Sequence, residues 1–248
     1  MKSHMIGEVE TMNDTKRLQE IRESERRSHI SVYSDTKLYS EGSWLRKPIK
    51  TVMEILPCFA GQSNLRILDL GCGVGRNSIS VAQHSKNSSC IIDCVDILEL
   101  AIQKLMEYAE EYHVSDHIRG IVRSIDDFSI PENHYDWIMA ISSLEHVDSR
   151  ESFVKKLYEI RNGIRKNGIV CLVINSDISE YNKQTNQDVP PQFEVNLPAE
   201  EIQKILHKIF IDWDILKNTH REQRYDIPRE SGIHVLHTTV VTYVARKV

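Results

Sequence analysis

The sequence has no long apolar run and no excess of positive charge. Its longest uninterrupted apolar stretch is Ile169–Ile174, which is far shorter than the roughly 20 residues of a membrane-spanning helix. The 36 Asp and Glu residues outnumber the 31 Lys and Arg residues, so the formal charge is −5. No overall positive field is therefore present to attract nucleic acid. We expect neither a membrane nor a nucleic acid as a partner.

Glycine, proline and cysteine are also scarce, with 10, 7 and 5 copies in 248 residues. Because 40% of the residues are hydrophobic, the composition excludes a collagen and a disordered chain. The odd number of scattered cysteines and the polar first residues predict free thiols in a reducing compartment, hence a cytoplasmic protein. Cys90 and Cys94 fall on one face of a short strand, and no second pair has zinc-like spacing, so we expect no metal site.

Short apolar runs alternate with longer amphipathic stretches through the middle of the chain. The runs predict strands at Arg66–Leu70, Cys90–Val95, Arg119–Val122, Trp137–Ile141 and Ile169–Ile174. The amphipathic stretches predict helices at Pro48–Phe59, Arg76–His84, Leu98–Tyr112 and Ser152–Arg165. Parallel strands need crossover connections of this kind. The pattern predicts a doubly wound α/β domain with a mostly parallel sheet and helices on both faces.

Both ends of the chain depart from this alternation. Residues 1–47 are charge-dense and helix-prone, which predicts an N-terminal helical arm or lid before a main domain over residues 48–248. The polar stretch 176–197 has no clear period and is long enough to predict a lid-like insertion. After a helix at Pro198–Ile209, the strands Trp213–Lys217 and Val235–Arg246 are expected to form an antiparallel hairpin at the sheet edge.

The most informative motif joins the first strand to the next helix. The strand ends in Asp69, and Gly71, Gly73 and Gly75 follow before the helix begins. Glycines allow a sharp turn and let a ligand lie against bare backbone. The helix N-terminus offers unpaired N–H groups to the same ligand. Asp96 ends the second strand, where a carboxylate can accept both hydroxyls of a ribose.

This pattern resembles the first motif and the following acid of class I S-adenosylmethionine-dependent methyltransferases. The resemblance implies a seven-stranded Rossmann-like sheet with a C-terminal antiparallel hairpin. It also implies that Gly71 and Gly73 pack against the methionine part of the cofactor, that Asp69 holds its amino group and that Asp96 binds its ribose.

Neighbouring residues complete the expected cofactor site. By spacing, Ser124 stands where many relatives place an acid that bonds adenine, and Asp126 follows it either as a cofactor contact or as a helix cap. Ile97 and Ile125 are candidate apolar walls for the ring, with ordinary core packing as the alternative. The expected cofactor-binding residues are Asp69, Gly71, Cys72, Gly73, Gly75, Asn77, Asp96, Ile97, Ser124, Ile125, Asp126 and Ser142.

The end of the fourth strand carries Leu144-Glu145-His146, which is similar to an element common among small-molecule methyltransferases. Methyl transfer from a sulfonium needs an in-line nucleophile and exclusion of water, so an anionic acceptor needs no base. For a neutral amine or hydroxyl acceptor, His146 is the first candidate base because its ordinary pKa lies near neutrality. A structural hydrogen bond for His146 and a helix-cap role for Glu145 are the alternatives.

A narrower resemblance is to the tellurite-resistance (TehB-like) group, carried by residues 71–78 and by Trp213–Lys217. It implies that Arg76 faces the acceptor, together with His220 and Arg221 near the C-terminal hairpin.

Aromatic residues of the N-terminal arm are candidates for closing the site. The ring faces of Tyr33 and Tyr39 would favour the sulfonium. Packing of the arm on the body is the alternative.

Together these features predict an S-adenosylmethionine-dependent methyltransferase that methylates a small molecule by in-line displacement and releases S-adenosylhomocysteine. One alternative is a catalytically silent binding or regulatory protein with the same fold. A nicotinamide-dependent oxidoreductase is disfavoured because Arg76 stands where a dinucleotide loop has its third glycine. The acceptor, its reacting atom and the oligomeric state stay open.

The resemblance generates a first prediction. Replacing Asp96 by alanine should abolish cofactor binding and leave the fold intact, because the ribose loses its carboxylate partner. Calorimetric titration of S-adenosylhomocysteine into Asp96→Ala tests this, and an unchanged affinity would contradict the role given to Asp96.

Overall fold

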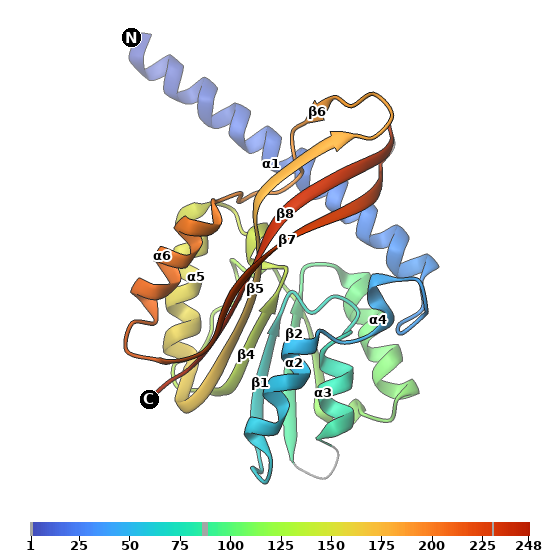
Figure 1. Ribbon diagram of the computed structural model, residues 1–248, viewed down its shortest axis with the longest axis vertical. Coiled ribbons are helices and arrows are strands. Elements are labelled where there is room, and N and C mark those ends of the chain that lie inside the picture. Colours follow the sequence, from blue (N-terminus) through green and yellow to red (C-terminus); the bar gives the residue numbers. More distant parts are fainter. Residues whose placement is uncertain (1, 86–88, 230) are drawn as a thin grey trace.

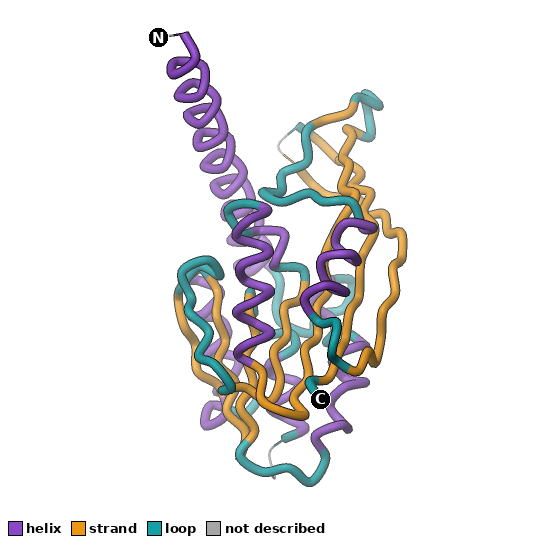
Figure 2. The backbone as a smooth tube through the Cα atoms, turned by 90° about the vertical axis from the view of Figure 1, so that its left-hand side faces the viewer, coloured by secondary structure: helices purple, strands orange, loops and turns teal. Residues whose placement is uncertain are grey.

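The protein was analysed as a computed structural model that describes residues 2–85, 89–229 and 231–248, without the side chains of residues 2–15 and 228. A twisted central sheet is flanked by helices on both faces, and a long N-terminal helix projects beyond the body (Figures 1 and 2). In the described part of the chain, no helix combines the length and the apolar character needed to cross a bilayer.

The sheet has the strand order β3-β2-β1-β4-β5-β8-β7, and a short β6 pairs with β5. The strands are β1 Leu65–Leu70, β2 Cys90–Asp96, β3 Ile118–Val122, β4 Tyr135–Ile141, β5 Ile164–Asn182, β6 Asp188–Val189, β7 Asp214–Arg229 and β8 Gly232–Arg246. Strands β1 to β5 run parallel, and β6, β7 and β8 pair antiparallel with their neighbours. The mostly parallel sheet and the C-terminal antiparallel hairpin are confirmed.

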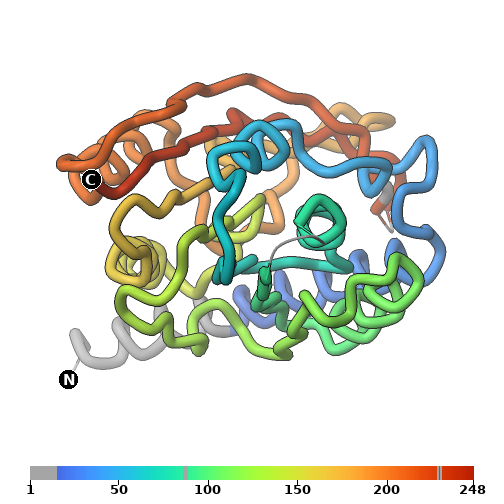
Figure 3. The backbone as a smooth tube through the Cα atoms, turned by 90° about the horizontal axis from the view of Figure 1, so that it is seen from below, coloured from blue at the N-terminus to red at the C-terminus, as the bar shows by residue number. Residues whose placement is uncertain are grey.

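Helices cover the two faces in separate groups. The α-helices are α1 Lys2–Asp35, α2 Lys50–Ile55, α3 Ser78–His84, α4 Glu99–Glu111, α5 Arg150–Gly163 and α6 Ala199–Ile209. The 3-10 turns are η1 Trp44–Arg46, η2 Leu56–Phe59, η3 Ser115–His117 and η4 Leu144–His146. One apolar core joins the sheet to α2, α3 and α4, and the other joins it to α5 and α6 (Figures 1 and 3). Burying both faces explains why the central strands read as continuous apolar runs.

The main departure from the sequence prediction is the length of β5. The predicted helix Ser152–Arg165 ends at Gly163, and β5 begins at once and continues to Asn182, into the segment expected to be a lid-like insertion. Residues 176–182 alternate between buried and exposed positions, as in a strand. Three of the buried positions hold the polar residues Ser176, Glu180 and Asn182 and only one holds an apolar residue, Ile178, so the hydrophobic pattern gave little signal there.

The sheet topology fixes where a ligand can bind. Strand β1 pairs with β2 on one side and with β4 on the other, because the chain passes from β1 to β2 and β3 and then crosses back to β4 and β5. In open α/β sheets this reversal opens a crevice at the carboxyl ends of the strands. The glycine loop, the end of β2 and the end of β4 all lie at this crevice.

The first glycine of the loop is required by close packing as well as by backbone conformation. Gly71 has φ +73°, and a Cβ there would stand 2.3 Å from the Cβ of Ser143. Gly42 has a similar φ of +77° with open space around it. Comparing alanine substitutions at Gly71 and Gly42 therefore separates the cost of the left-handed backbone from the cost of a steric clash.

We therefore expect Gly42→Ala to cost about 1 kcal/mol of unfolding free energy, since only the left-handed conformation is penalised. Gly71→Ala should cost roughly 1–3 kcal/mol more, because the added methyl group must displace Ser143. Urea denaturation followed by circular dichroism measures both losses. Equal losses would show that packing against Ser143 contributes nothing.

Candidate active site

The glycine loop is held to the end of β2 by backbone hydrogen bonds. The amides of Gly71 and Cys72 both donate to the Val95 carbonyl, at 2.8 and 3.0 Å. At Gly73 a Cβ would stand 2.7 Å from the Tyr33 hydroxyl of α1. The loop therefore presents bare backbone toward the N-terminal helix, where a side chain would not fit.

Asp96 organises the loop and keeps capacity for a ligand. Its Oδ2 accepts from the Gly73 amide and its Oδ1 accepts from the Leu98 amide, both at 2.9 Å. An ionised carboxylate has about four acceptor positions, so roughly two stay free for hydroxyl donors. Burial raises the pKa of Asp96, although these two backbone donors oppose the shift.

Asp69 is fully enclosed at the end of β1, with 1% of its surface exposed. Its Oδ2 accepts from the Ser78 hydroxyl at 2.5 Å. Burial, reinforced by the nearby charge of Asp96, raises the pKa of Asp69 to about 7, and the Ser78 bond opposes this. A cationic group beside Asp69 would favour its ionised form.

Apolar side chains stand exposed next to Asp96. Ile97 is 58% exposed, although it directly follows a buried strand. Ile125 is half-buried and reaches within 3.6 Å of the Cβ position at Gly71. An apolar group of a ligand can cover both, because exposed apolar surface at a crevice is typical of a binding site.

Other expected cofactor contacts already have protein partners. Ser124 Oγ donates to Asp127 and accepts from its amide, so Ser124 caps the turn after β3. The Asp126 carboxylate accepts from the Asp148 amide at 3.2 Å. The Asn77 side chain is buried and accepts from the Ile49 amide at 3.0 Å.

Cys72 and Ser142 differ in exposure. Cys72 is buried in the loop, whereas Ser142 is exposed at the carboxyl end of β4 with φ +52°. The cofactor roles of all these residues stay predictions.

His146 has a carboxylate partner that the sequence did not indicate. Its Nδ1 lies 2.9 Å from Oε2 of Glu194, and its ring stacks on Phe193 at 5.1 Å between centroids. Burial lowers its pKa, but the Glu194 hydrogen bond and the charges of Glu145, Glu194 and Glu25 outweigh this and raise the pKa to about 9. His146 is thus an imidazolium at neutral pH, unlike the near-neutral base that its ordinary pKa suggested.

Glu145 is 1% exposed, and burial raises its pKa. Its Oε1 accepts from the amide and the side chain of Asn175. Its Oε2 is buried and has no hydrogen-bond partner among the described residues. A buried acceptor without a donor is costly, so Oε2 can receive a hydrogen bond from a bound ligand.

Aromatic residues of the arm surround Arg76. The Arg76 guanidinium lies over the Trp44 ring at 5.1 Å and donates to the Trp44 carbonyl at 2.8 Å. Tyr39 donates to the Arg76 carbonyl at 3.0 Å, and Tyr33 is buried. Both tyrosines therefore pack beside the loop, as expected for the arm.

His220 and Arg221 are exposed on β7, which β4, β5 and β8 separate from β1 in the sheet. His220 Nδ1 lies 3.2 Å from the Gln203 amide nitrogen on α6. Tyr225 on the same strand lies near Arg76: burial raises the pKa of Tyr225 and the Arg76 charge lowers it. The roles of His220 and Arg221 toward the acceptor stay predictions.

Sequence reasoning missed the polar contacts that fasten α1 over the site. Arg22 pairs with Asp148 and lies 3.7 Å from Glu194. Glu25 lies 3.4 Å from Arg229 near the end of β7. These partners are far apart in sequence, so no local pattern could have found them.

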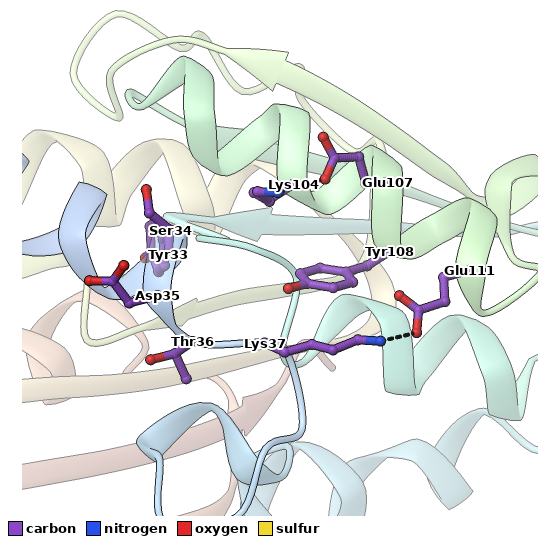
Figure 4. Close-up of a pocket in the computed structure, with 9 residues that line it drawn as sticks. All are labelled: Tyr33, Ser34, Asp35, Thr36, Lys37, Lys104, Glu107, Tyr108 and Glu111. Carbon is purple, nitrogen blue, oxygen red and sulfur yellow. Dashed lines mark hydrogen bonds and ion pairs between the residues drawn. The ribbon is translucent and has the colours of Figure 1, made fainter.

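The pocket in Figure 4 lies beside this crevice. It has a volume of about 380 Å³ and is lined by Tyr33, Ser34, Asp35, Thr36, Lys37, Lys104, Glu107, Tyr108 and Glu111. The Lys37–Glu111 ion pair at 2.8 Å closes one side of it. Its lining includes no residue of the glycine loop, so we do not assign it to the cofactor. Across the described ranges, no group of three or more His, Cys, Asp or Glu side chains is arranged for a metal ion.

Comparisons with known proteins agree with this geometry. Residues 67–168 match a family model described as a methyltransferase domain. The chain is 27% identical over 127 residues to carboxy-S-adenosyl-L-methionine synthase of Shewanella piezotolerans, covering 50% of this chain and 49% of that protein. The chain therefore spans about half the length of this relative.

Two solved structures share the fold. TehB from Haemophilus influenzae has a TM-score of 0.58 at 20% identity, over 79% of this chain and 62% of that one. The 1,6-didemethyltoxoflavin-N1-methyltransferase of Burkholderia thailandensis, which holds 1,6-didemethyltoxoflavin and S-adenosylhomocysteine, has a TM-score of 0.57 at 17% identity, over 93% and 90% of the two chains. The predicted Rossmann-like fold and the likeness to TehB are confirmed.

The raised pKa of Asp69 gives a stability prediction. The unfolded carboxyl ionises near pH 4, but the folded one only near pH 7, so the wild type loses stability as the pH rises between these values. Asp69→Asn escapes this loss, and its advantage over the wild type should grow from about pH 4 to about pH 7, exceed about 1 kcal/mol and then stay constant. Urea denaturation across this range measures it, with exposed Asp116→Asn as the control. A pH-independent difference would contradict the raised pKa.

Proposed function

We propose that this chain, whose residues 67–168 match a methyltransferase domain, transfers a methyl group from S-adenosylmethionine to a small-molecule acceptor by in-line displacement. The single observation that carries the proposal is the loop between β1 and α3. There the Gly73 amide donates to Asp96, whose carboxylate keeps acceptor capacity for a ligand. Both lie at the crevice where sheets of this topology bind ligands.

The residues of the loop fit this cofactor. Asp96 would hold the ribose hydroxyls, and Asp69 would hold the ammonium group, whose charge relieves the burial of that carboxylate. Ile97 and Ile125 would cover the adenine ring. When bound, S-adenosylmethionine supplies a methyl group on a cationic sulfur.

The remaining residues would exclude water and orient the acceptor. Helix α1 closes the loop through Tyr33, and Tyr39 secures the turn that follows. Holding the two reactants in line accounts for roughly 7–11 kcal/mol of barrier lowering in well-oriented reactions. A good leaving group and this orientation suffice, so the proposal needs no metal.

The acceptor would sit beside Glu145, His146 and Arg76. The imidazolium of His146 and the guanidinium of Arg76 favour an acceptor that reacts as an anion. We further propose that residues 1–47 act as a lid on the domain formed by residues 48–248, that segment 176–197 helps to enclose the acceptor and that the protein works in the cytoplasm.

Binding and turnover have to be measured separately, since one relative is named as a synthase of a modified S-adenosylmethionine. We expect S-adenosylhomocysteine, but not NAD, to stabilise the protein in thermal denaturation, by about 2.7 kcal/mol at a concentration one hundred times its Kd. Exposed Asp116→Ala should bind like the wild type, as a control for Asp96→Ala.

Turnover is tested by incubating the protein with methyl-labelled S-adenosylmethionine and a panel of small metabolites. Label should move to an acceptor with release of S-adenosylhomocysteine. Binding without transfer across the panel would favour a regulatory protein, and stabilisation by NAD alone would favour an oxidoreductase.

A further inference from the structure

Glu194 stands between the end of β4 and helix α1. Its side chain is 3% exposed, although it lies in an irregular segment after β6. One carboxylate oxygen bonds Nδ1 of His146 at 2.9 Å, and the other lies 3.7 Å from Nε of Arg22. The carboxylate is thus fixed from both sides, which is unusual for a glutamate in a loop.

These contacts define the orientation of the imidazole. Glu194 takes the Nδ1 edge, and the neighbouring Phe193 stacks on one face with 27° between the rings. The side chain of His146 is still 27% exposed. Its Nε2 has no hydrogen-bond partner in the parts of the chain that the structure describes, and is the nitrogen left for a ligand.

We propose that Glu194 is the positioning residue of His146 and directs its Nε2 to take the proton from a hydroxyl or thiol group of the acceptor. This rests on the function proposed above. The resting imidazolium carries a proton on each ring nitrogen, so Nε2 first releases its proton to water. The O–H or S–H bond of the acceptor then breaks, an N–H bond forms at Nε2, and the Nδ1–H stays bonded to Glu194. This proton leaves His146 for water after the product departs.

The charges around His146 come from several elements. Helix α1 provides Arg22, Glu25 and His29, and the segment after β6 provides Glu194. The others are Glu145 on η4, Asp148 after η4 and Asp96 at the end of β2. The carboxylates outweigh burial, so the imidazolium persists at neutral pH. An imidazolium beside an anionic acceptor carries the same number of protons as a neutral imidazole beside a neutral acceptor.

The proposal is tested without any acceptor, by following the ring nitrogens of His146 in the ligand-free, isotope-labelled full chain by NMR. His146→Gln assigns the signal. In the wild type the group should titrate at about 9, with the proton of the neutral form on Nδ1. Glu194→Gln removes the charge but keeps an acceptor, so it should lower the pKa by roughly 1–3 units and keep this tautomer.

Two further variants separate positioning from general stability. Glu194→Ala removes charge and acceptor, and should lower the pKa and also mix the two tautomers. Glu201→Gln is the matched control, because Glu201 pairs with Arg150 at 2.7 Å on the surface and should leave His146 unchanged. A wild-type neutral form protonated on Nε2, or a Glu194→Gln pKa equal to that of the wild type, would overturn the proposal.

These outcomes are independent of methyl transfer. A chain that fails to bind S-adenosylhomocysteine would refute the proposed function even with the expected titration. Conversely, a chain that transfers methyl groups but shows no effect of Glu194 on His146 would refute only the positioning role.

Discussion

The site depends on the pair of backbone hydrogen bonds that the amides of Gly71 and Cys72 donate to the Val95 carbonyl. These bonds turn the chain sharply at Gly71 and join the end of β1 to the end of β2. As a consequence, Asp96 comes close enough to Asp69 for its charge to raise the pKa of Asp69. The helix after the loop then begins at the same crevice. The candidate contacts on the glycine loop and at Asp96 follow from this junction.

Burial of acidic groups is the second organising feature. Asp69, Asp96 and Glu145 belong to three strand ends, and burial raises the pKa of each. Among neighbouring cations, Arg76 is already engaged by Trp44, and His146 is paired with Glu194. Ionising these buried carboxyl groups is therefore costly, and a cationic ligand in the crevice would offset this cost. A sulfonium compound with an ammonium group has the complementary charge.

The sequence was sufficient wherever burial followed hydrophobicity. The strand before Asp69, the glycine loop and the helix after it lie where the pattern predicted them, because apolar side chains cover both faces of the sheet there. The pattern failed along residues 176–182. There the inward positions hold Glu180 and Asn182, which bond His234 across the ladder instead of packing as hydrocarbon. Such contacts exist only once β5 and β8 are paired.

The residues of the candidate site also differ in whether the sequence alone reveals them. Asp96 was identifiable because a motif and a strand end coincide at it, whereas Glu194 has no local signature and gains its meaning from a histidine in another element. Asn77, inside the motif, accepts from the Ile49 amide through its side chain, a contact that the motif did not indicate. Both contacts are tertiary.

Three segments outside residues 67–168 are joined by ion pairs: helix α1, the segment around Glu194 and the end of β7. Helix α1 contacts the segment around Glu194 through Arg22 and the end of β7 through Glu25. Because both contacts come from one helix, a displacement of α1 would separate charged groups in the segment around Glu194 and at the end of β7 together.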